Sequence, residues 1–279
     1  MEQRDYIIRG GVEGRERLRV VSRVMQSTTH DLLGCAGIRR GMACLEVGCG
    51  GGDLAFDMAR MVGPEGRVVG TDIDHKKLEL ACQEAAEQQL TSTEFQFADI
   101  TQTQPQAEFD LVHARFVLTH LRDPGAAVAT MRRALRTGGV LVVEDIDFRG
   151  YFCYPECPAL WRYVELYTEA VRRKGADANI GPRLPALLAE AGLEGVQMNV
   201  VQPAGTEGEV KLVTPLTMEN IGDAVVAEGL ASPAEIKQLV AELYKFAHTP
   251  GTVGCAPRIV QAWGYRPGGT HGSHNDGLS

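Results

Sequence analysis

A dense run of glycines, placed between an apolar segment and a helical one, constrains the fold of this 279-residue chain more than any other feature. The segment 44–53 reads CLEVGCGGGD, so a short apolar run passes directly into Gly48, Gly50, Gly51 and Gly52. Glycine has no Cβ, and the main chain of such a turn can therefore touch a ligand and adopt positive φ at little cost. The pattern predicts a ligand site where a strand leaves its sheet and enters a helix.

Short apolar runs alternate with helical stretches over the rest of the chain. The helical stretches are long enough to serve as crossovers between parallel strands. The pattern predicts an α/β fold with a Rossmann-like, seven-stranded, mostly parallel sheet and helices on both faces, plus N-terminal helices and a helical cap. The expected strands are 44–47, 67–72, 94–99, 109–114, 139–145, 195–203 and 258–265, and the expected helices are 53–61, 75–88, 124–136 and 183–191, with two more beginning near 215 and 232.

Breaks in this rhythm divide the chain. Residues 1–40 carry apolar residues at helical spacing and predict an N-terminal helical lid, while 41–147 are expected to form the ligand-binding core. The segment 148–182 is too long for a simple crossover and predicts a helical insert, or cap. Residues 183–266 are expected to complete the core with two further helices, and the polar, Gly-rich residues 267–279 predict a disordered tail.

The acids around the glycines favour one kind of ligand over another. Gly50, Gly52 and Ala55 match the relaxed form of the dinucleotide fingerprint. Glu46, however, stands two residues before the first glycine, and Asp53 occupies the helix start, where a diphosphate would meet its negative charge. An acidic loop suits a ligand that carries an ammonium and a sulfonium. The E-x-G-x-G-x-G sequence resembles motif I of the class I methyltransferases, and this resemblance implies S-adenosylmethionine as the cofactor.

Two further acids close the next strands at the same edge of the expected sheet. Asp72 ends the second strand, where a carboxylate can accept hydrogen bonds from both ribose hydroxyls of an adenosine, and Ile73 follows it. Asp99 ends the third strand, and its carboxylate, with the N–H of Ile100, suits the amino group and a ring nitrogen of adenine. Asp74 is interpreted instead as a helix cap.

The segments FDLVHARFVLTHLRDP and ALRTGGVLVVED resemble the region between the fourth and fifth strands of small-molecule methyltransferases akin to the ubiquinone and menaquinone biosynthesis enzymes. The resemblance implies that Arg115 and Phe116 reach the methionine end of the donor, although core packing explains Phe116 equally well. Tyr6, followed by two glycines, resembles the N-terminal lid of that group, in which a tyrosine covers the donor; an anchored surface tyrosine is the alternative. The expected cofactor-binding residues are Tyr6, Glu46, Gly48, Gly50, Gly52, Asp72, Ile73, Asp99, Ile100, Arg115 and Phe116.

Methyl transfer from a sulfonium is an in-line displacement, so positioning in a dry pocket is the main task of such an enzyme. A general base is needed only if the acceptor loses a proton during the reaction. The candidates expected to face the pocket are His120, Glu144, Asp145 and Asp147. Glu144 and Asp145, at the end of strand five, are favoured, and helix packing explains His120 as well as catalysis does. Asp145 and Asp147 resemble part of a magnesium site, but no acid stands beyond strand four to complete it, and no metal is expected.

The insert is rich in aromatic residues. These side chains could line an apolar acceptor pocket or simply pack the cap onto the sheet. They are Tyr151, Phe152, Tyr154, Trp161, Tyr163 and Tyr167.

Composition and charge limit the kinds of partner and the location that we expect for this protein. A net charge of -8 and a pI of about 5.4 argue against duplex nucleic acid, which requires a basic surface. The seven cysteines are scattered, which is typical of reduced, intracellular thiols. The first residues have no signal-peptide pattern, and no run approaches the roughly 18 apolar residues needed to cross a bilayer. A cytoplasmic protein with no membrane span is therefore expected.

Together these features predict methyl transfer from S-adenosylmethionine to a small, largely apolar organic molecule of secondary or cofactor metabolism. One alternative is an RNA or protein methyltransferase. The Asn/Asp-Pro-Pro-Tyr/Phe signature, which suits planar exocyclic amines, is missing after strand four, where HARF stands instead. A non-catalytic cofactor-binding module is another alternative. A small-molecule acceptor is the expected partner, whereas the acceptor's identity, the atom methylated and the presence of a homo-oligomer stay open.

Overall fold

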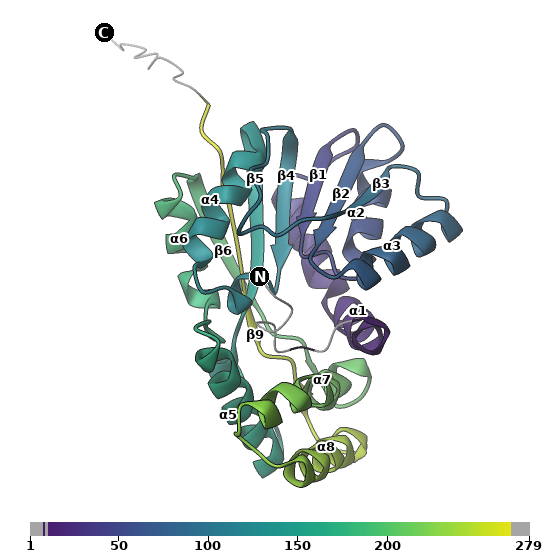
Figure 1. Ribbon diagram of the computed structural model, residues 1–279, viewed down its shortest axis with the longest axis vertical. Helices are drawn as coiled ribbons and strands as arrows, with labels where there is room; N and C mark the ends of the chain where they lie inside the picture. The colour runs from purple at the N-terminus through teal and green to yellow at the C-terminus, as the bar shows by residue number, and fades with distance from the viewer. Residues whose placement is uncertain (1–7, 9–10, 269–279) are drawn as a thin grey trace.

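Seven strands form the central sheet of the computed structural model, which describes residue 8 and residues 11–268 (Figure 1). The strand order is β3-β2-β1-β4-β5-β9-β6. Neighbours from β3 to β5 are parallel, and β9 runs antiparallel to both β5 and β6. The expected Rossmann-like, mostly parallel sheet is confirmed. The strands are β1 (Ala43–Val47), β2 (Arg67–Asp72), β3 (Thr93–Phe97), β4 (Phe109–Arg115), β5 (Leu135–Asp147), β6 (Glu194–Val201) and β9 (Arg258–Tyr265).

Helices cover both faces of this sheet because its buried strands carry apolar side chains on both sides. Leu111 belongs to the core shared with α1 and α2, whereas its neighbour Val112 belongs to the core shared with α4 and α6. Val142 and Leu141 divide in the same way. The helices concerned are α1 (Gly11–Cys35), α2 (Asp53–Val62), α3 (His75–Glu87), α4 (Pro124–Ala134) and α6 (Leu184–Glu190).

Several helix starts follow from the capping residues in the sequence. Asp123 accepts a hydrogen bond from the N–H of Ala126, directly before the proline that opens α4. Ser232 and Glu235 form the expected capping box at the start of α8. Such caps satisfy backbone donors that a helix N-terminus leaves unpaired.

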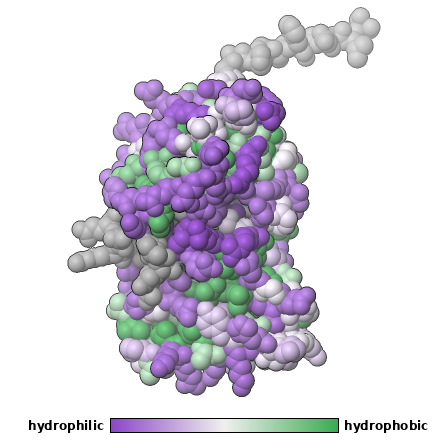
Figure 2. All heavy atoms as spheres, turned by 90° about the vertical axis from the view of Figure 1, so that its right-hand side faces the viewer, coloured by the Kyte–Doolittle hydropathy of each residue, from purple (hydrophilic) through white to green (hydrophobic). Residues whose placement is uncertain are grey.

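A cap lies at the carboxyl end of the sheet strands, in the lower half of Figure 1. It is built from two chain segments: α7 and α8, expected with the core, pack against α5 of the insert, and α7 also packs against α1. Figure 2 shows hydrophobic residues reaching the surface at several places over this half. The cap elements are α5 (Pro158–Arg173), α7 (Val213–Ala227) and α8 (Pro233–His248), with η5 (Glu209–Leu212) and the short pair β7 (Ala204–Gly205) and β8 (Gly254–Cys255).

The N-terminal helix and β5 differ from the expected elements. The described part of 1–40 contains one continuous helix, α1, and not several. β5 begins at Leu135, earlier than expected, because Leu135 pairs with Phe109 of β4 and ends α4 at Ala134. Tyr6 and residues 269–279 of the expected tail lie outside the described residues.

Candidate functional site

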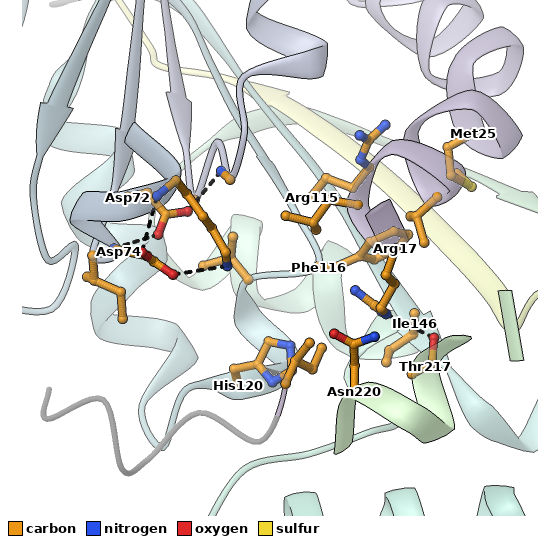
Figure 3. Close-up of a pocket in the computed structure, with 18 of the residues that line it drawn as sticks. Arg17, Met25, Asp72, Asp74, Arg115, Phe116, His120, Ile146, Thr217 and Asn220 are labelled. Atoms are coloured by element: carbon orange, nitrogen blue, oxygen red, sulfur yellow. Dashed lines mark hydrogen bonds and ion pairs between the residues drawn. The ribbon is translucent and has the colours of Figure 1, made fainter. Parts of the chain in front are cut away.

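A cavity of about 660 Å³ lies between the carboxyl ends of the strands and the cap. Figure 3 shows Asp72 and Asp74 on its sheet side and Arg17, Thr217 and Asn220 on its cap side. We call the part lined by Asp72 and Asp74 the sheet half, and the part lined by Arg17, Thr217 and Asn220 the cap half. It brings together nine of the expected cofactor-binding residues, namely Glu46, Gly48, Gly50, Asp72, Ile73, Asp99, Ile100, Arg115 and Phe116.

The glycine-rich loop needs its glycines for conformation and for space. Gly48 and Gly50 have φ values of 68° and 56°, in the region that side chains with a Cβ rarely adopt. A Cβ on Gly48 would lie 2.5 Å from Cγ2 of Val117. Gly52 is not among the residues that line the cavity; it is the left-handed N-cap of α2, tightly packed against Phe56.

Asp72 fixes this loop while it lines the cavity. Its Oδ2 accepts a hydrogen bond from the N–H of Gly50 at 2.8 Å, and its Oδ1 accepts one from the N–H of Asp74 at 2.9 Å. A carboxylate has about four lone-pair sites, so both oxygens retain acceptor capacity. Asp74 caps α3 through the N–H groups of Lys76 and Lys77, as expected, and also lines the cavity.

Asp99 and Ile100 form the next part of the wall, after β3. The Asp99 carboxylate accepts hydrogen bonds from the N–H and the hydroxyl of Thr101, at 2.9 and 2.6 Å. These bonds hold the side chain beside the edge of the cavity, where the sequence predicted recognition of adenine.

Glu46 is the buried acid of the loop. Its side chain lines the cavity, yet the residue is only 4% exposed. Burial raises the pKa of Glu46 to about 8, although the positive charge of Arg115 acts to lower it. Its Oε2 has no hydrogen-bond partner among the described residues. A buried carboxyl with an unpaired oxygen on a cavity wall favours a ligand that brings a hydrogen-bond donor or a positive charge.

The acid at the helix start is less available than the sequence suggested. Asp53 lines the cavity, but Arg15 of α1 donates to both of its oxygens and also pairs with Glu84 of α3. The negative charge of Asp53 is thus partly neutralised. Recognition of a cationic ligand is therefore expected to depend more on Glu46 and Asp72 than on Asp53.

Arg115 and Phe116 line the cavity at the end of β4. The Arg115 guanidinium donates to the hydroxyl of Thr29 at 3.2 Å and lies 6.0 Å from the centre of the Phe116 ring. Phe116 has a φ of 57°, which is uncommon for a residue with a bulky side chain. Its N–H donates to the carbonyl of Glu144 at 2.9 Å, and this bond holds the turn.

Glu144 does not face the cavity, contrary to expectation. It is fully buried on the α1 face of β5, because side chains alternate along a strand and Val142 points to that face. Its carboxylate accepts hydrogen bonds from Thr29 at 2.9 Å, His113 at 3.1 Å and Gln261 at 2.7 Å. Burial lowers the pKa of His113, so a neutral ring donates from Nε2. Glu144 thus belongs to a polar network inside the core.

Asp145 points to the opposite face of β5 and is also absent from the cavity wall. Its carboxylate accepts hydrogen bonds from the N–H groups of Thr119 at 3.0 Å and Ile146 at 2.9 Å. Burial raises the pKa of Asp145 to about 7. The turn after β4 contains η2 (Leu118–His120). These bonds fix that turn to the end of β5.

His120 is the one member of the expected catalytic set that lines the cavity. The residue is 8% exposed, and burial, with the charges of Arg17 and Lys77, lowers the pKa of His120 to about 3. The ring is therefore neutral at physiological pH. Figure 3 shows the ring among the side chains that line the cavity.

Aromatic rings line the cap half. Phe148 of η3 (Phe148–Gly150), which the sequence argument missed, stacks on Tyr167 with ring centres 4.1 Å apart and meets Tyr151 edge-on at 5.1 Å. Tyr151, Tyr163 and Tyr167 line the cavity together with Phe148. The other expected aromatics, Phe152, Tyr154 and Trp161, are exposed.

Arg17, Thr217 and Asn220 are among the polar residues of the cavity that were not predicted. Arg17 comes from α1, and Thr217 and Asn220 come from α7. Arg17 stands in a charged helical stretch that looks solvated in the sequence, and the two α7 residues look like ordinary interruptions of an apolar face. Only the packing of α7 against α1 brings them to one wall.

Within residues 8 and 11–268, no group of three or more His, Cys, Asp or Glu side chains is placed to hold a metal ion. No helix in the same part of the chain has the length and apolar character needed to span a bilayer.

Known proteins resemble part of this chain in sequence. Residues 38–175 match the family described as Methyltransferase domain. An uncharacterised 37.1 kDa protein in transposon Tn4556 of Streptomyces fradiae is 33% identical over 156 residues, which are 55% of this chain and 44% of that protein. The ubiquinone/menaquinone biosynthesis C-methyltransferase UbiE of Serratia proteamaculans is 30% identical over 135 residues, 46% of this chain and 50% of UbiE. The chain thus spans about half the length of each relative.

A solved structure extends the likeness in fold to more of the chain. A putative methyltransferase from Bacillus halodurans C-125 superimposes with a TM-score of 0.59 at 21% identity, covering 87% of this chain and all of that one. At this identity the likeness concerns the fold alone.

Proposed function

We propose that this chain is a class I, S-adenosylmethionine-dependent methyltransferase and that it transfers a methyl group to a small, largely apolar organic molecule. The match of residues 38–175 to the Methyltransferase domain family and the likeness to UbiE support the proposal. The observation that carries the proposal is the acidic rim of one cavity. Glu46, Asp72 and Asp99 line it beside a glycine-rich loop, at the carboxyl ends of three neighbouring strands.

The residues of the sheet half fit the donor. The unpaired, buried Oε2 of Glu46 suits a cationic group, which a diphosphate would not provide. Asp72 would hold the ribose hydroxyls, and Asp99 with Ile100 would hold the adenine edge. Arg115 and the loop around Gly48 would border the methionine end. When bound, the donor supplies an electrophilic methyl group on a sulfonium.

The chain's own residues then have two tasks. The first is to hold the acceptor in line with the methyl group, because near-attack positioning supplies roughly 7–11 kcal/mol of the barrier in well-oriented reactions. The second is to exclude water, for which the aromatic cap half, with Phe148, Tyr151 and Tyr167, is suited.

His120 is our candidate for contact with the reacting group of the acceptor. Glu144 and Asp145 are held in bonds inside the protein, whereas His120 lines the cavity. The pKa of about 3 keeps its ring neutral, so it would orient an acceptor hydroxyl by a hydrogen bond without a charge of its own.

Two measurements test the proposal. Calorimetry should detect S-adenosylmethionine binding at micromolar concentration and no binding of NAD. Incubation with an isotope-labelled methyl donor and a metabolite extract should then label a small molecule. Label in RNA or protein fractions alone would favour the alternative substrates, and donor binding without any label would favour a non-catalytic module.

A further inference from the structure

Asn220 presents an unused hydrogen-bond acceptor to the cap half of the cavity. Its Nδ2 donates to the carbonyl of Leu216 at 2.8 Å, one turn back on α7, which fixes the orientation of the amide. The residue is 9% exposed, and its Oδ1 has no partner among the described residues. Figure 3 shows the amide pointing into the cavity. A buried, unpaired amide oxygen favours a ligand that brings a donor to it.

Arg17 brings an uncompensated positive charge to the same wall. Its Nε donates to the hydroxyl of Thr217 at 3.0 Å, and within the described residues no carboxylate lies within ion-pair distance of the guanidinium. Asp223, one turn beyond Asn220, also lines the cavity but is exposed. A guanidinium presents donors and no acceptor, so this wall favours an oxygen atom and opposes a second cation.

Apolar side chains line the same half of the cavity. Ile146, Phe148 and Tyr167 are among them, and the two rings stack on one another. Flat apolar surface of this kind binds the body of a ligand by burial, while a few polar groups fix its orientation. The cap half therefore combines an apolar wall, one acceptor and one cationic donor.

We propose that Asn220 and Arg17 select the acceptor: it is largely apolar, is not cationic, and carries a hydroxyl group that donates to Oδ1 of Asn220 and accepts from Arg17. A cationic amine is excluded by Arg17, and an ether is disfavoured because it leaves Oδ1 of Asn220 unpaired. The inference rests on the proposed function, since it assigns the sheet half to the methyl donor and the cap half to the acceptor.

Three probes of similar size test this assignment: 2-naphthol, 2-methoxynaphthalene and 1-aminomethylnaphthalene, which is a cation at neutral pH. Their dissociation constants are measured with the full chain saturated with S-adenosylhomocysteine. We expect 2-naphthol to bind at least about tenfold more tightly than either of the others, as the loss of one buried hydrogen bond predicts.

Variants assign the preference to the two residues. Asn220→Leu should weaken 2-naphthol binding by about tenfold and change 2-methoxynaphthalene binding by less than about threefold. Arg17→Met should improve binding of the cationic probe relative to 2-naphthol. Glu219→Leu and Arg19→Met are matched controls, since they lie on the same two helices and do not line the cavity.

The outcomes separate the two proposals. Failure of S-adenosylhomocysteine to bind the unmodified protein counts against the proposed function itself. Normal binding of S-adenosylhomocysteine with equal affinity for all three probes, or with no probe bound, overturns the acceptor assignment. So does a preference for 2-naphthol that survives Asn220→Leu.

Discussion

The carboxylate of Asp72 accepts a hydrogen bond from the N–H of Gly50 at 2.8 Å, so the acid at the end of β2 holds the glycine-rich loop that follows β1. The two elements are neighbours in the sheet, with Val47 paired to Thr71. Donor binding should therefore depend on Asp72 in two ways, through direct contact with the ribose and through the shape of the loop.

Replacing Asp72 with Ala should weaken S-adenosylmethionine binding by roughly 1–3 kcal/mol, because the ribose hydroxyls lose a charged acceptor. Calorimetric titration of both proteins measures the difference. Glu79→Ala is the control: this acid lies on α3, which follows Asp72 in the chain, but outside the cavity. Equal donor affinity in the Asp72 variant and the unmodified protein would count against the placement of the adenosine.

Glu46 should make donor binding release a proton. Its carboxyl has a pKa of about 8 and is mostly protonated at pH 7 in the free protein. A cationic ligand beside it stabilises the ionised form, so binding at pH 7 should release up to about one proton. Titrations in two buffers of different ionisation enthalpy measure this number. At about pH 9 the free carboxyl is already ionised, and the release should disappear.

The matched variant is Glu46→Gln, which has the same shape and no titration. It should bind the donor more weakly and release no proton at pH 7. Proton release that is unchanged in this variant would assign the effect to another group.

Gly48→Ala should damage both stability and donor binding. The position has a φ of 68°, and the new Cβ would lie 2.5 Å from Cγ2 of Val117. Backbone strain of this kind costs on the order of 1–3 kcal/mol, and the clash adds to it. Gly41→Ala separates the two effects, because Gly41 has a φ of 80° and open space around it. Chemical denaturation of both variants should show the larger loss for Gly48→Ala.

The sequence could predict the sheet half of the site because that half follows from local pattern. Glu46, Asp72 and Asp99 each stand at or near the end of an apolar run, and parallel strands bring their carboxyl ends to one edge. No long-range packing had to be known to bring these residues together.

The cap half could not be predicted in the same way. Arg17 and Asn220 are about 200 positions apart in the chain, and only the contact of α1 with α7 makes them neighbours. The error over Glu144 has a different cause. Its position at the end of β5 was predicted, but the face of the strand was not, and a shift of one residue reverses the direction of a side chain.

Glu144→Leu should destabilise the fold by about 3–5 kcal/mol, since it leaves the buried donors of Thr29, His113 and Gln261 without their acceptor. Denaturant unfolding measures this loss. Glu144→Gln is the conservative variant, and it should retain the methyl-transfer rate per folded molecule while it lowers stability. A variant that is fully folded and inactive would instead support a catalytic role for Glu144.

His120 should make the stability of the fold depend on pH. Burial lowers its pKa to about 3 from the ordinary value of 6.5, so between these values the unfolded chain binds a proton that the folded protein does not. The stabilisation is complete above pH 6.5 and is lost progressively as the pH falls toward 3.

In His120→Asn, the slope of unfolding free energy against pH over this window should decrease by up to about 1.4 kcal/mol per pH unit. Denaturant titrations between about pH 4.5 and pH 7 measure the slope, with His248→Asn, at an exposed position of α8, as the control. Parallel curves for the unmodified protein and the His120 variant would show that the buried ring is not the group responsible.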